Sequence, residues 1–159
     1  MRKVMIIIIS ISLSLPVFSQ VSRDADGRYT NADGTAYSGT YTEYYANGAQ
    51  RLVMNLKNGL PDGQTTLYYP NGDLKEVRGY KNGKKHGNWT QWSPGEVKTS
   101  EAHYTMGFKS GEWKIRDKDG NLIYRLVYDQ KENRTGIWKR YNKEGKVVET
   151  RSFITANME

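Results

Sequence analysis

Aromatic and β-branched residues recur along the chain in short segments that polar, glycine-containing turns separate. In the stretch KNGKKHGNWTQW, residues 81–92, a turn sequence runs into a segment that contains Trp89 and Trp92. Comparable pairs of segments rich in Tyr, Trp, Val, Ile and Thr, which favour strands, fill most of the chain. No amphipathic helical stretch of useful length is found. The pattern therefore predicts β-hairpins joined by tight turns.

Glycines mark a repeat of about 24 residues. The first series is spaced by 24, 24, 24 and 25 residues, and a second follows it by eight or nine. Glycine supplies the positive φ that tight hairpin turns need. The repeat-turn glycines predicted from these two series are Gly39, Gly48, Gly63, Gly72, Gly87, Gly95, Gly111, Gly120, Gly136 and Gly145. A third series of glycines stands four residues before the first glycine of the next unit, and Glu132 replaces the glycine of this series before the last unit. The joint DQKENRTG around Glu132 is longer than the others and is expected to be irregular.

Aromatic residues keep the same period as the glycines. Two residues after the first glycine stand Tyr41, Thr65, Trp89, Trp113 and Trp138. Five residues after it stand Tyr44, Tyr68, Trp92, Arg116 and Tyr141. The units close on Leu56, Tyr80, Tyr104, Tyr128 and Phe153. We therefore predict an all-β fold, an elongated single-layer antiparallel meander of about five 24-residue β-hairpin repeats, with about ten strands.

The pattern G-x-W-x-x-Y-x-x-x-G followed by Y-x-x-G-x-x-x-G resembles the MORN repeat variant. The segments YKNGKKHGNWTQW and GEWKIRDKDGNLIYRLVY carry the resemblance, which covers roughly Tyr37 to Phe153. The chain is similar to exported members that carry the label YwqK-type antitoxin. The resemblance implies a twisted sheet of hairpins that binds or scaffolds rather than catalyses. Thr65 and Arg116 depart from the aromatic positions of the pattern.

The N-terminal residues have the features of a secretory signal peptide. MRK is a positive region, an uncharged apolar run follows, and Val17 and Ser19 occupy the −3 and −1 positions. A retained membrane anchor is the alternative, although the run is shorter than the ~20 residues of a spanning helix. The predicted organisation is a signal peptide (1–19), an N-terminal segment with a degenerate capping repeat (20–36), a repeat domain (37–153) and a tail (154–159).

Export predicts a periplasmic or secreted protein. The chain has no cysteine, which excludes a lipoprotein anchor, disulfides and thiolate chemistry. Without the predicted signal peptide, 22 basic residues face 17 acidic ones, a net charge of +5. This moderate, interspersed charge suits a solvated surface near anionic envelope components, and we expect no nucleic-acid partner. Membrane contact is expected only through the signal peptide or peripherally.

Sequence motifs of catalysis are missing. No nucleophile elbow, zinc-protease, P-loop or dinucleotide fingerprint occurs. His86 and His103 are expected to be solvated surface residues, and DADG at 24–27 lacks the remaining ligands of a calcium loop. We therefore expect no enzyme activity, no cofactor and no metal.

Nine aromatic residues form the candidate binding face. They are Tyr44, Tyr45, Tyr68, Tyr69, Trp89, Trp92, Trp113, Trp138 and Tyr141. The alternative is that these rings form the core, which is favoured for the tryptophans. Residues two and five after the glycine would point to opposite faces of an ideal strand, unless a bulge or coil turns one inward. The cluster Lys81, Lys84, Lys85 and His86 either grips an anion or guards against strand addition.

Binding is therefore the predicted function. We expect an exported, non-enzymatic module for another protein or an envelope surface. The alternatives are a carbohydrate or peptidoglycan module that uses the aromatic rows, and an antitoxin-like protein, which rests on the family label alone. Homo-oligomers through the open sheet ends are a further possibility.

Overall fold

The computed structural model describes residues 21–153. The predicted signal peptide (1–19) and tail (154–159) lie outside the described residues. Among those described, no helix is long and apolar enough to cross a membrane.

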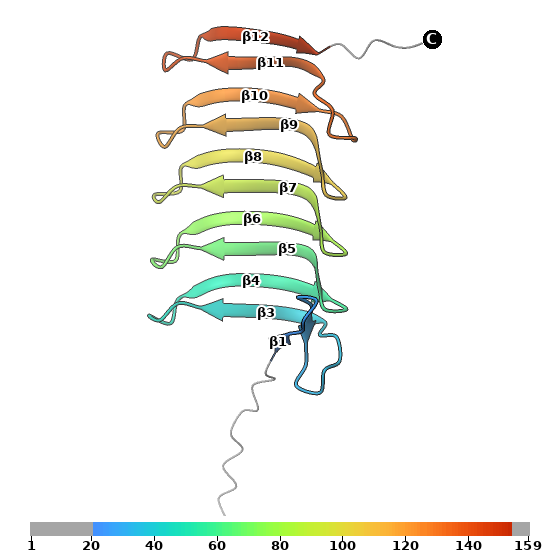
Figure 1. Cartoon of the computed structure of the whole chain (residues 1–159). Coiled ribbons are helices and arrows are strands. Elements are labelled where there is room, and N and C mark those ends of the chain that lie inside the picture. The colour runs from blue at the N-terminus through green and yellow to red at the C-terminus, as the bar shows by residue number, and fades with distance from the viewer. Residues whose placement is uncertain (1–20, 154–159) are drawn as a thin grey trace, which may run out of the picture.

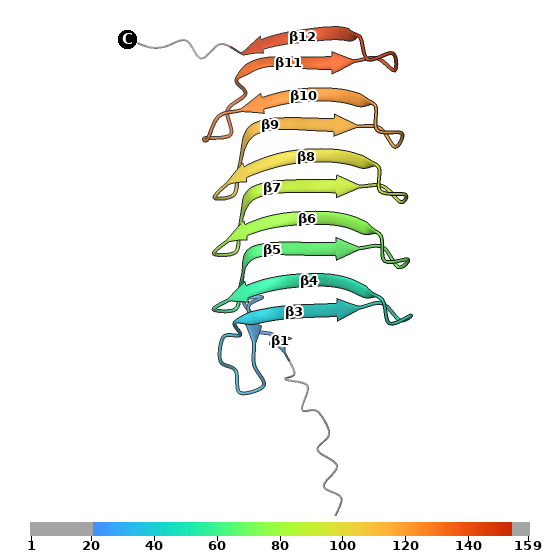
Figure 2. The same ribbon diagram turned by 180° about the vertical axis from the view of Figure 1, so that it is seen from behind.

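Ten strands form one open antiparallel sheet in which each strand pairs with the next one along the chain (Figures 1 and 2). This arrangement confirms the predicted single-layer meander of hairpins. The strands are β3 (Gly39–Tyr44), β4 (Gln50–Lys57), β5 (Leu60–Tyr68), β6 (Leu74–Lys81), β7 (Lys84–Trp92), β8 (Lys98–Thr105), β9 (Phe108–Arg116), β10 (Leu122–Tyr128), β11 (Gly136–Tyr141) and β12 (Val147–Phe153).

Of the predicted repeat-turn glycines, only the second series lies in turns, because Gly63, Gly87 and Gly111 lie within strands and Gly39 and Gly136 begin strands. All ten have a positive φ, for example +83° at Gly48 and +63° at Gly111. Gly111 lies directly across from Tyr128 in the ladder of strands β9 and β10. An aromatic side chain opposite a glycine covers backbone that the glycine leaves bare, which explains why closing aromatics and first glycines share one period.

A β-bulge lies within every hairpin of the ten-stranded sheet. The register shifts beside the residue five positions after the first glycine, as at Tyr68, which faces Leu74, while its neighbour Leu67 faces Glu76. The sequence left open whether a bulge or two aromatic faces accommodates this position. A bulge is present, but its extra residue, Lys75, lies on the second strand of the hairpin, so it breaks the strict alternation of β6 and not that of β5.

The longer joint between β10 and β11 is irregular, as predicted. Only two residue pairs keep register there, Tyr124 with Arg140 and Arg125 with Lys139, with an isolated bridge from Tyr128 to Arg134. Glu132 takes a φ of +68° in the turn. This joint is the least regular connection between neighbouring strands of the sheet.

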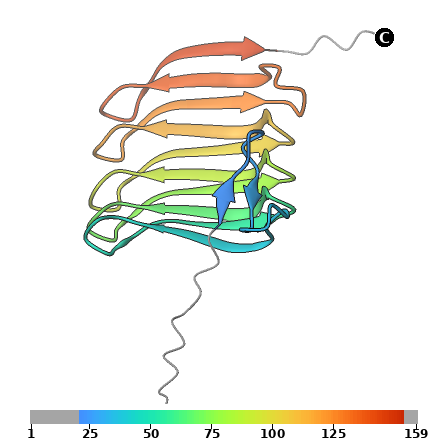
Figure 3. The same ribbon diagram turned by 60° about the horizontal axis from the view of Figure 1, so that its bottom comes forward.

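The N-terminal residues form a separate hairpin, β1 (Ser22–Arg23) and β2 (Tyr29–Thr30). It is not a strand of the large sheet but lies over its N-terminal part (Figure 3). Tyr29 donates its backbone N–H to the Gly59 carbonyl over 2.9 Å, and its ring packs with Met54 and Leu56 in the buried core.

Candidate binding face

One face of the sheet carries a continuous row of aromatic rings. Strand register places Trp89, Trp113 and Trp138 on the same face, together with the closing aromatics. Successive ring centroids are 4.8–5.5 Å apart. The row, called the aromatic ladder below, is Tyr80, Trp89, Tyr104, Trp113, Tyr128, Trp138 and Phe153. The face that carries it is called the ladder face.

The tryptophans of the ladder also satisfy main-chain carbonyls. The Trp89 indole Nε1–H donates to the Gly79 carbonyl over 2.9 Å, and that of Trp138 to the Val127 carbonyl over 2.8 Å. The Trp113 Nε1–H lies 3.1 Å from the His103 carbonyl. Each accepting carbonyl belongs to the strand that precedes the tryptophan, and for Trp89 and Trp113 it lies where the register of the two strands shifts. A buried tryptophan needs such a partner for its N–H, so these rings have a structural role.

Cations cover part of the ladder. The Lys85 ammonium lies 4.6 Å from the Trp89 ring centroid and 4.8 Å from that of Tyr104. Lys109 lies in the same way over Trp113 and Tyr128, and Arg134 over Trp138 and Phe153. Each cation stands two residues before the first glycine of its unit. Cation–π attraction therefore repeats with the fold and shields ring faces from a stacking ligand.

The adjacent tyrosines of the candidate binding face, Tyr44 with Tyr45 and Tyr68 with Tyr69, have different surroundings in the structure. The Tyr45 hydroxyl donates to the Tyr68 carbonyl over 2.8 Å, and the Tyr69 hydroxyl to the Trp92 carbonyl over 2.9 Å. These bonds tie one unit to the next, 23 residues on. Tyr44, in contrast, is 61% exposed. The nine candidate residues thus do not form one surface, because some rings lie in the ladder and others at the hairpin ends.

At the N-terminal end of the ladder face, the ladder is interrupted and covered. Thr65 occupies the tryptophan position and is 1% exposed, opposite Met54 of the preceding strand. The hairpin β1–β2 lies on this region, and its Tyr29 ring packs 4.9 Å from that of Tyr41. The hairpin supplies the aromatic cover that the repeat lacks at Thr65.

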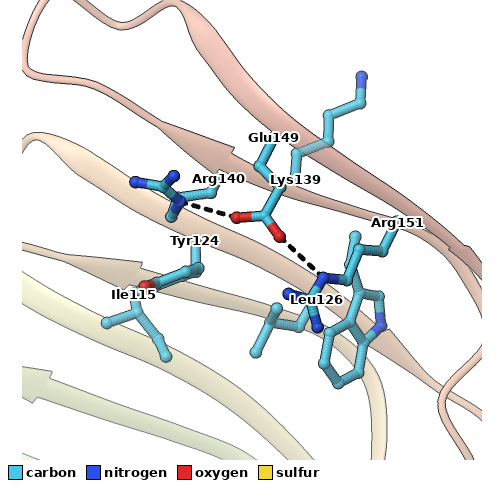
Figure 4. Close-up of a pocket in the computed structure, with 8 residues that line it drawn as sticks. Ile115, Tyr124, Leu126, Lys139, Arg140, Glu149 and Arg151 are labelled. Atoms are coloured by element: carbon cyan, nitrogen blue, oxygen red, sulfur yellow. Dashed lines mark hydrogen bonds and ion pairs between the residues drawn. The ribbon is translucent and has the colours of Figure 1, made fainter.

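At the C-terminal end, the ladder face is hollowed and open. A pocket of about 450 Å³ lies over strands β9 to β12 (Figure 4). Tyr124, which lines it, is 39% exposed. The full lining is Ile115, Tyr124, Leu126, Trp138, Lys139, Arg140, Glu149 and Arg151. Apolar side chains form the floor of the pocket, and charged groups form one rim.

Glu149 joins two arginines at this rim. Arg140 Nε donates to Glu149 Oε2 over 3.0 Å, and Arg151 Nε to Oε1 over 2.8 Å (Figure 4). These two bonds hold the pKa of the Glu149 carboxyl below its ordinary value of 4.5. The carboxylate is therefore charged at neutral pH and fixed between two guanidinium groups that keep a net positive charge.

His86 and His103 were both expected at the solvated surface, but both are half-buried. The His103 Nδ1 lies 2.8 Å from the Ser110 Oγ. Ser110 is 3% exposed and also bonds the Thr105 hydroxyl. The buried hydroxyl is closed to a substrate, so this pair has a packing role. Within residues 21–153 no group of three or more His, Cys, Asp or Glu side chains is placed to hold a metal ion.

Two segments of the chain match the family model of the MORN repeat variant, residues 61–82 and 134–154. The first segment spans the hairpin β5–β6 and the second the hairpin β11–β12. These two segments are similar to MORN repeat variants, and each of them corresponds to one hairpin of the sheet. Among curated proteins, none matches the chain.

Proposed function

We propose that the protein is an exported, non-enzymatic MORN repeat module that binds a segment of another protein on the open C-terminal end of its ladder face. One observation carries the proposal. The ladder face is covered by a hairpin at its N-terminal end, whereas no segment within residues 21–153 covers the pocket with an apolar floor at the other end.

The covered end indicates the kind of ligand that suits the open one. There, a short hairpin inserts the Tyr29 ring against Tyr41, Met54 and Leu56. At the open end, Tyr124 and Leu126 offer a comparable apolar surface, and Arg140 and Arg151 add positive charge. A partner segment with one aromatic or aliphatic side chain and a neighbouring carboxylate matches this lining.

A capture experiment tests the proposal. The tagged chain is incubated with solubilised envelope, alongside a Tyr124→Ala, Leu126→Ala double variant. Ile137→Ala is the matched control, because Ile137 is 50% exposed and lies on the opposite face of the neighbouring strand β11. We expect one partner to be captured by the wild type and the control and lost by the double variant, with all three unfolding at similar urea concentrations. Capture that the double variant retains would contradict the proposal.

A carbohydrate ligand is the second candidate. The exposed Tyr124 ring beside the Arg140 and Arg151 guanidinium groups favours it, because such a set can stack on a sugar and pair with its carboxylate. Trp138 lines the same pocket, so its fluorescence is the readout. Soluble cell-wall glycans should shift the emission of the wild type and not that of Tyr124→Ala. An unchanged wild-type spectrum at high glycan concentration rules this candidate out.

Export is part of the proposal. It is supported by the charged and apolar pattern of residues 1–19, and N-terminal sequencing of the processed chain tests it, with Gln20 expected first. An antitoxin role would rest on the family label alone, and a toxin gene beside this one would be its first support.

A further inference from the structure

The last strand of the sheet has an open edge. Within residues 21–153, β12 pairs with β11 and with no other strand. Val147 and Val148 on it are 45% and 47% exposed. The first strand differs, because the Tyr37 hydroxyl donates to the Thr40 carbonyl of β3 over 2.9 Å and the N-terminal hairpin lies beside it. An open edge of unpaired N–H and C=O groups is a template for another strand.

The sequence of β12 is complementary to itself. Its residues read VVETRSF, from Val147 to Phe153. When the strand runs antiparallel to a second copy about Thr150, Glu149 faces Arg151 on both sides of the axis. In the same register Phe153 and Ser152 come opposite Val147 and Val148, where β12 has a bulge in its pairing with β11. The regular pairs are therefore those of Glu149, Thr150 and Arg151, and both charged pairs are of opposite sign.

We propose that two copies of the chain pair through β12, antiparallel and with Thr150 on the two-fold axis. The pairing continues the sheet from one copy into the other and keeps the ladder face on the same side. It goes beyond the proposed partner binding, because it needs no other molecule.

Neighbouring registers are less favourable for two reasons. A shift by one position brings Glu149 opposite Thr150 of the partner subunit, and this turns the ladder face of one copy to the back of the other, since opposite residues share a face. Centring the pair on Arg151 or Glu149 keeps the faces aligned but places two like charges directly opposite, which destabilises a sheet. The register about Thr150 avoids both faults.

The pairing also extends the pocket. Glu149 and Arg151 form the rim of the pocket at the open edge. In the dimer, Arg151 of the partner subunit lies across from Glu149, about 5 Å away between α-carbons. The two pockets then lie side by side across the axis, so a partner segment can contact both copies.

Cysteine cross-linking tests the register, because the chain has no cysteine of its own. Paired strands place opposite α-carbons at ~4.5–5.5 Å, within the range a disulfide spans. In the full chain, purified as the host processes it, Thr150→Cys should form a disulfide dimer under mild oxidation. Val148→Cys is the matched control, since its own copies would lie ~14 Å apart at ~3.4 Å per residue. An equal mixture of Glu149→Cys and Arg151→Cys should cross-link where Val148→Cys alone does not, and it keeps one pair of opposite charges across the axis. Cross-linking of Val148→Cys alone to the same extent as Thr150→Cys would overturn the register.

Sedimentation equilibrium tests the association without cysteines. We expect the wild type to dimerise and the single variants Arg151→Glu and Glu149→Arg each to weaken the dimer about tenfold or more, because both charged pairs become repulsive. Mixing the two variants should restore the dimer, since each then faces its opposite charge. A wild type that stays monomeric to high micromolar concentration, or a mixture that gains nothing, would overturn the proposal. The cross-linking result stands even if a charge variant loses β12.

Discussion

At the N-terminal end of the ladder face, Tyr29 packs against Tyr41, and Met54 and Leu56 are buried beneath the hairpin. At the C-terminal end, Trp138 stands in the ladder, but Tyr124 remains 39% exposed beside an open pocket. The first end contains the smallest residue at the tryptophan position, Thr65, and the most deeply buried one. The separate hairpin β1–β2 therefore covers the ladder face at the place where the repeat has Thr65 instead of a tryptophan.

This difference shows how a single layer is stabilised. A sheet one strand thick cannot bury both faces, so its apolar contacts come either from rings that lie along the sheet or from a segment folded over it. Each unit touches only its neighbours, and the stability is close to a sum of local terms. The two ends should therefore respond separately to substitution.

Trp113→Ala should have the largest effect. Trp113 contacts Tyr104 and Tyr128 at centroid distances of 5.1 and 5.5 Å, and its loss divides the ladder in the middle. We expect the free energy of unfolding to fall by about 3 kcal/mol, at the low end for a core aromatic because the ring is only partly buried. Urea unfolding measures it. Tyr124→Ala, on the same face but outside the ladder, is the control and should cost less than about 1 kcal/mol; equal losses would show that the ladder is not the source of stability.

Tyr29→Ala should have the second largest effect on stability, and it should act at the N-terminal end of the ladder face. The ring is almost fully buried, but the hairpin is terminal, so we expect a loss of about 2 kcal/mol. Hydrogen exchange should quicken in residues 21–37 and in β3 and β4, while β9 to β12 keep their protection. Tyr44→Ala, 61% exposed on β3, should change stability by less than about 0.5 kcal/mol. Faster hydrogen exchange throughout the sheet would contradict the expectation that the two ends respond separately to substitution.

Much of the fold that the two ends share could be predicted from the sequence. The period of the glycines and aromatics gave the strands, their order and the irregular joint at Glu132, because turn chemistry and alternation are local properties. The cations over the ladder could have been found too, since Lys85, Lys109 and Arg134 share one repeat position. The contacts that the N-terminal hairpin makes by folding back over the sheet do not repeat with this period.

The other contacts could not be predicted, because they join residues that are far apart in the sequence and close together in space. Nothing local to Tyr29 indicates that its hairpin lies over Met54 rather than extending the sheet. The bonds from Tyr45 and Tyr69 to the next unit recur with the repeat, but their acceptors are main-chain carbonyls, which a pattern of side chains does not indicate. The pocket arises from Tyr124 and Leu126, neither of which was predicted, because it lies between strands of two different repeats.

Lys109→Gln should have a smaller effect on the C-terminal half. The ammonium lies about 5.5 Å from the Trp113 and Tyr128 ring centroids. We expect a loss of about 0.5–1 kcal/mol in urea unfolding, the usual worth of an exposed cation–π contact. Lys143→Gln removes the same charge from an exposed turn residue and should have no measurable effect. An equal change in both variants would assign the loss to net charge rather than to the rings.

Acid should weaken the C-terminal half more than the N-terminal one, by the smallest effect considered. Glu112, through Lys114 and Arg125, and Glu149, through Arg140 and Arg151, have carboxyl pKa values below the ordinary 4.5. A depressed pKa means that the unfolded chain binds the proton first, so these contacts contribute fully above about pH 4.5 and are lost as the pH falls through the lower folded values. Urea midpoints followed from pH 6 to pH 3 should therefore fall, and Glu149→Gln should flatten part of that fall. Hydrogen exchange at pH 3.5 should quicken in β9 to β12 before β3 to β6, and the reverse order would place the acid-sensitive contacts under the N-terminal hairpin instead.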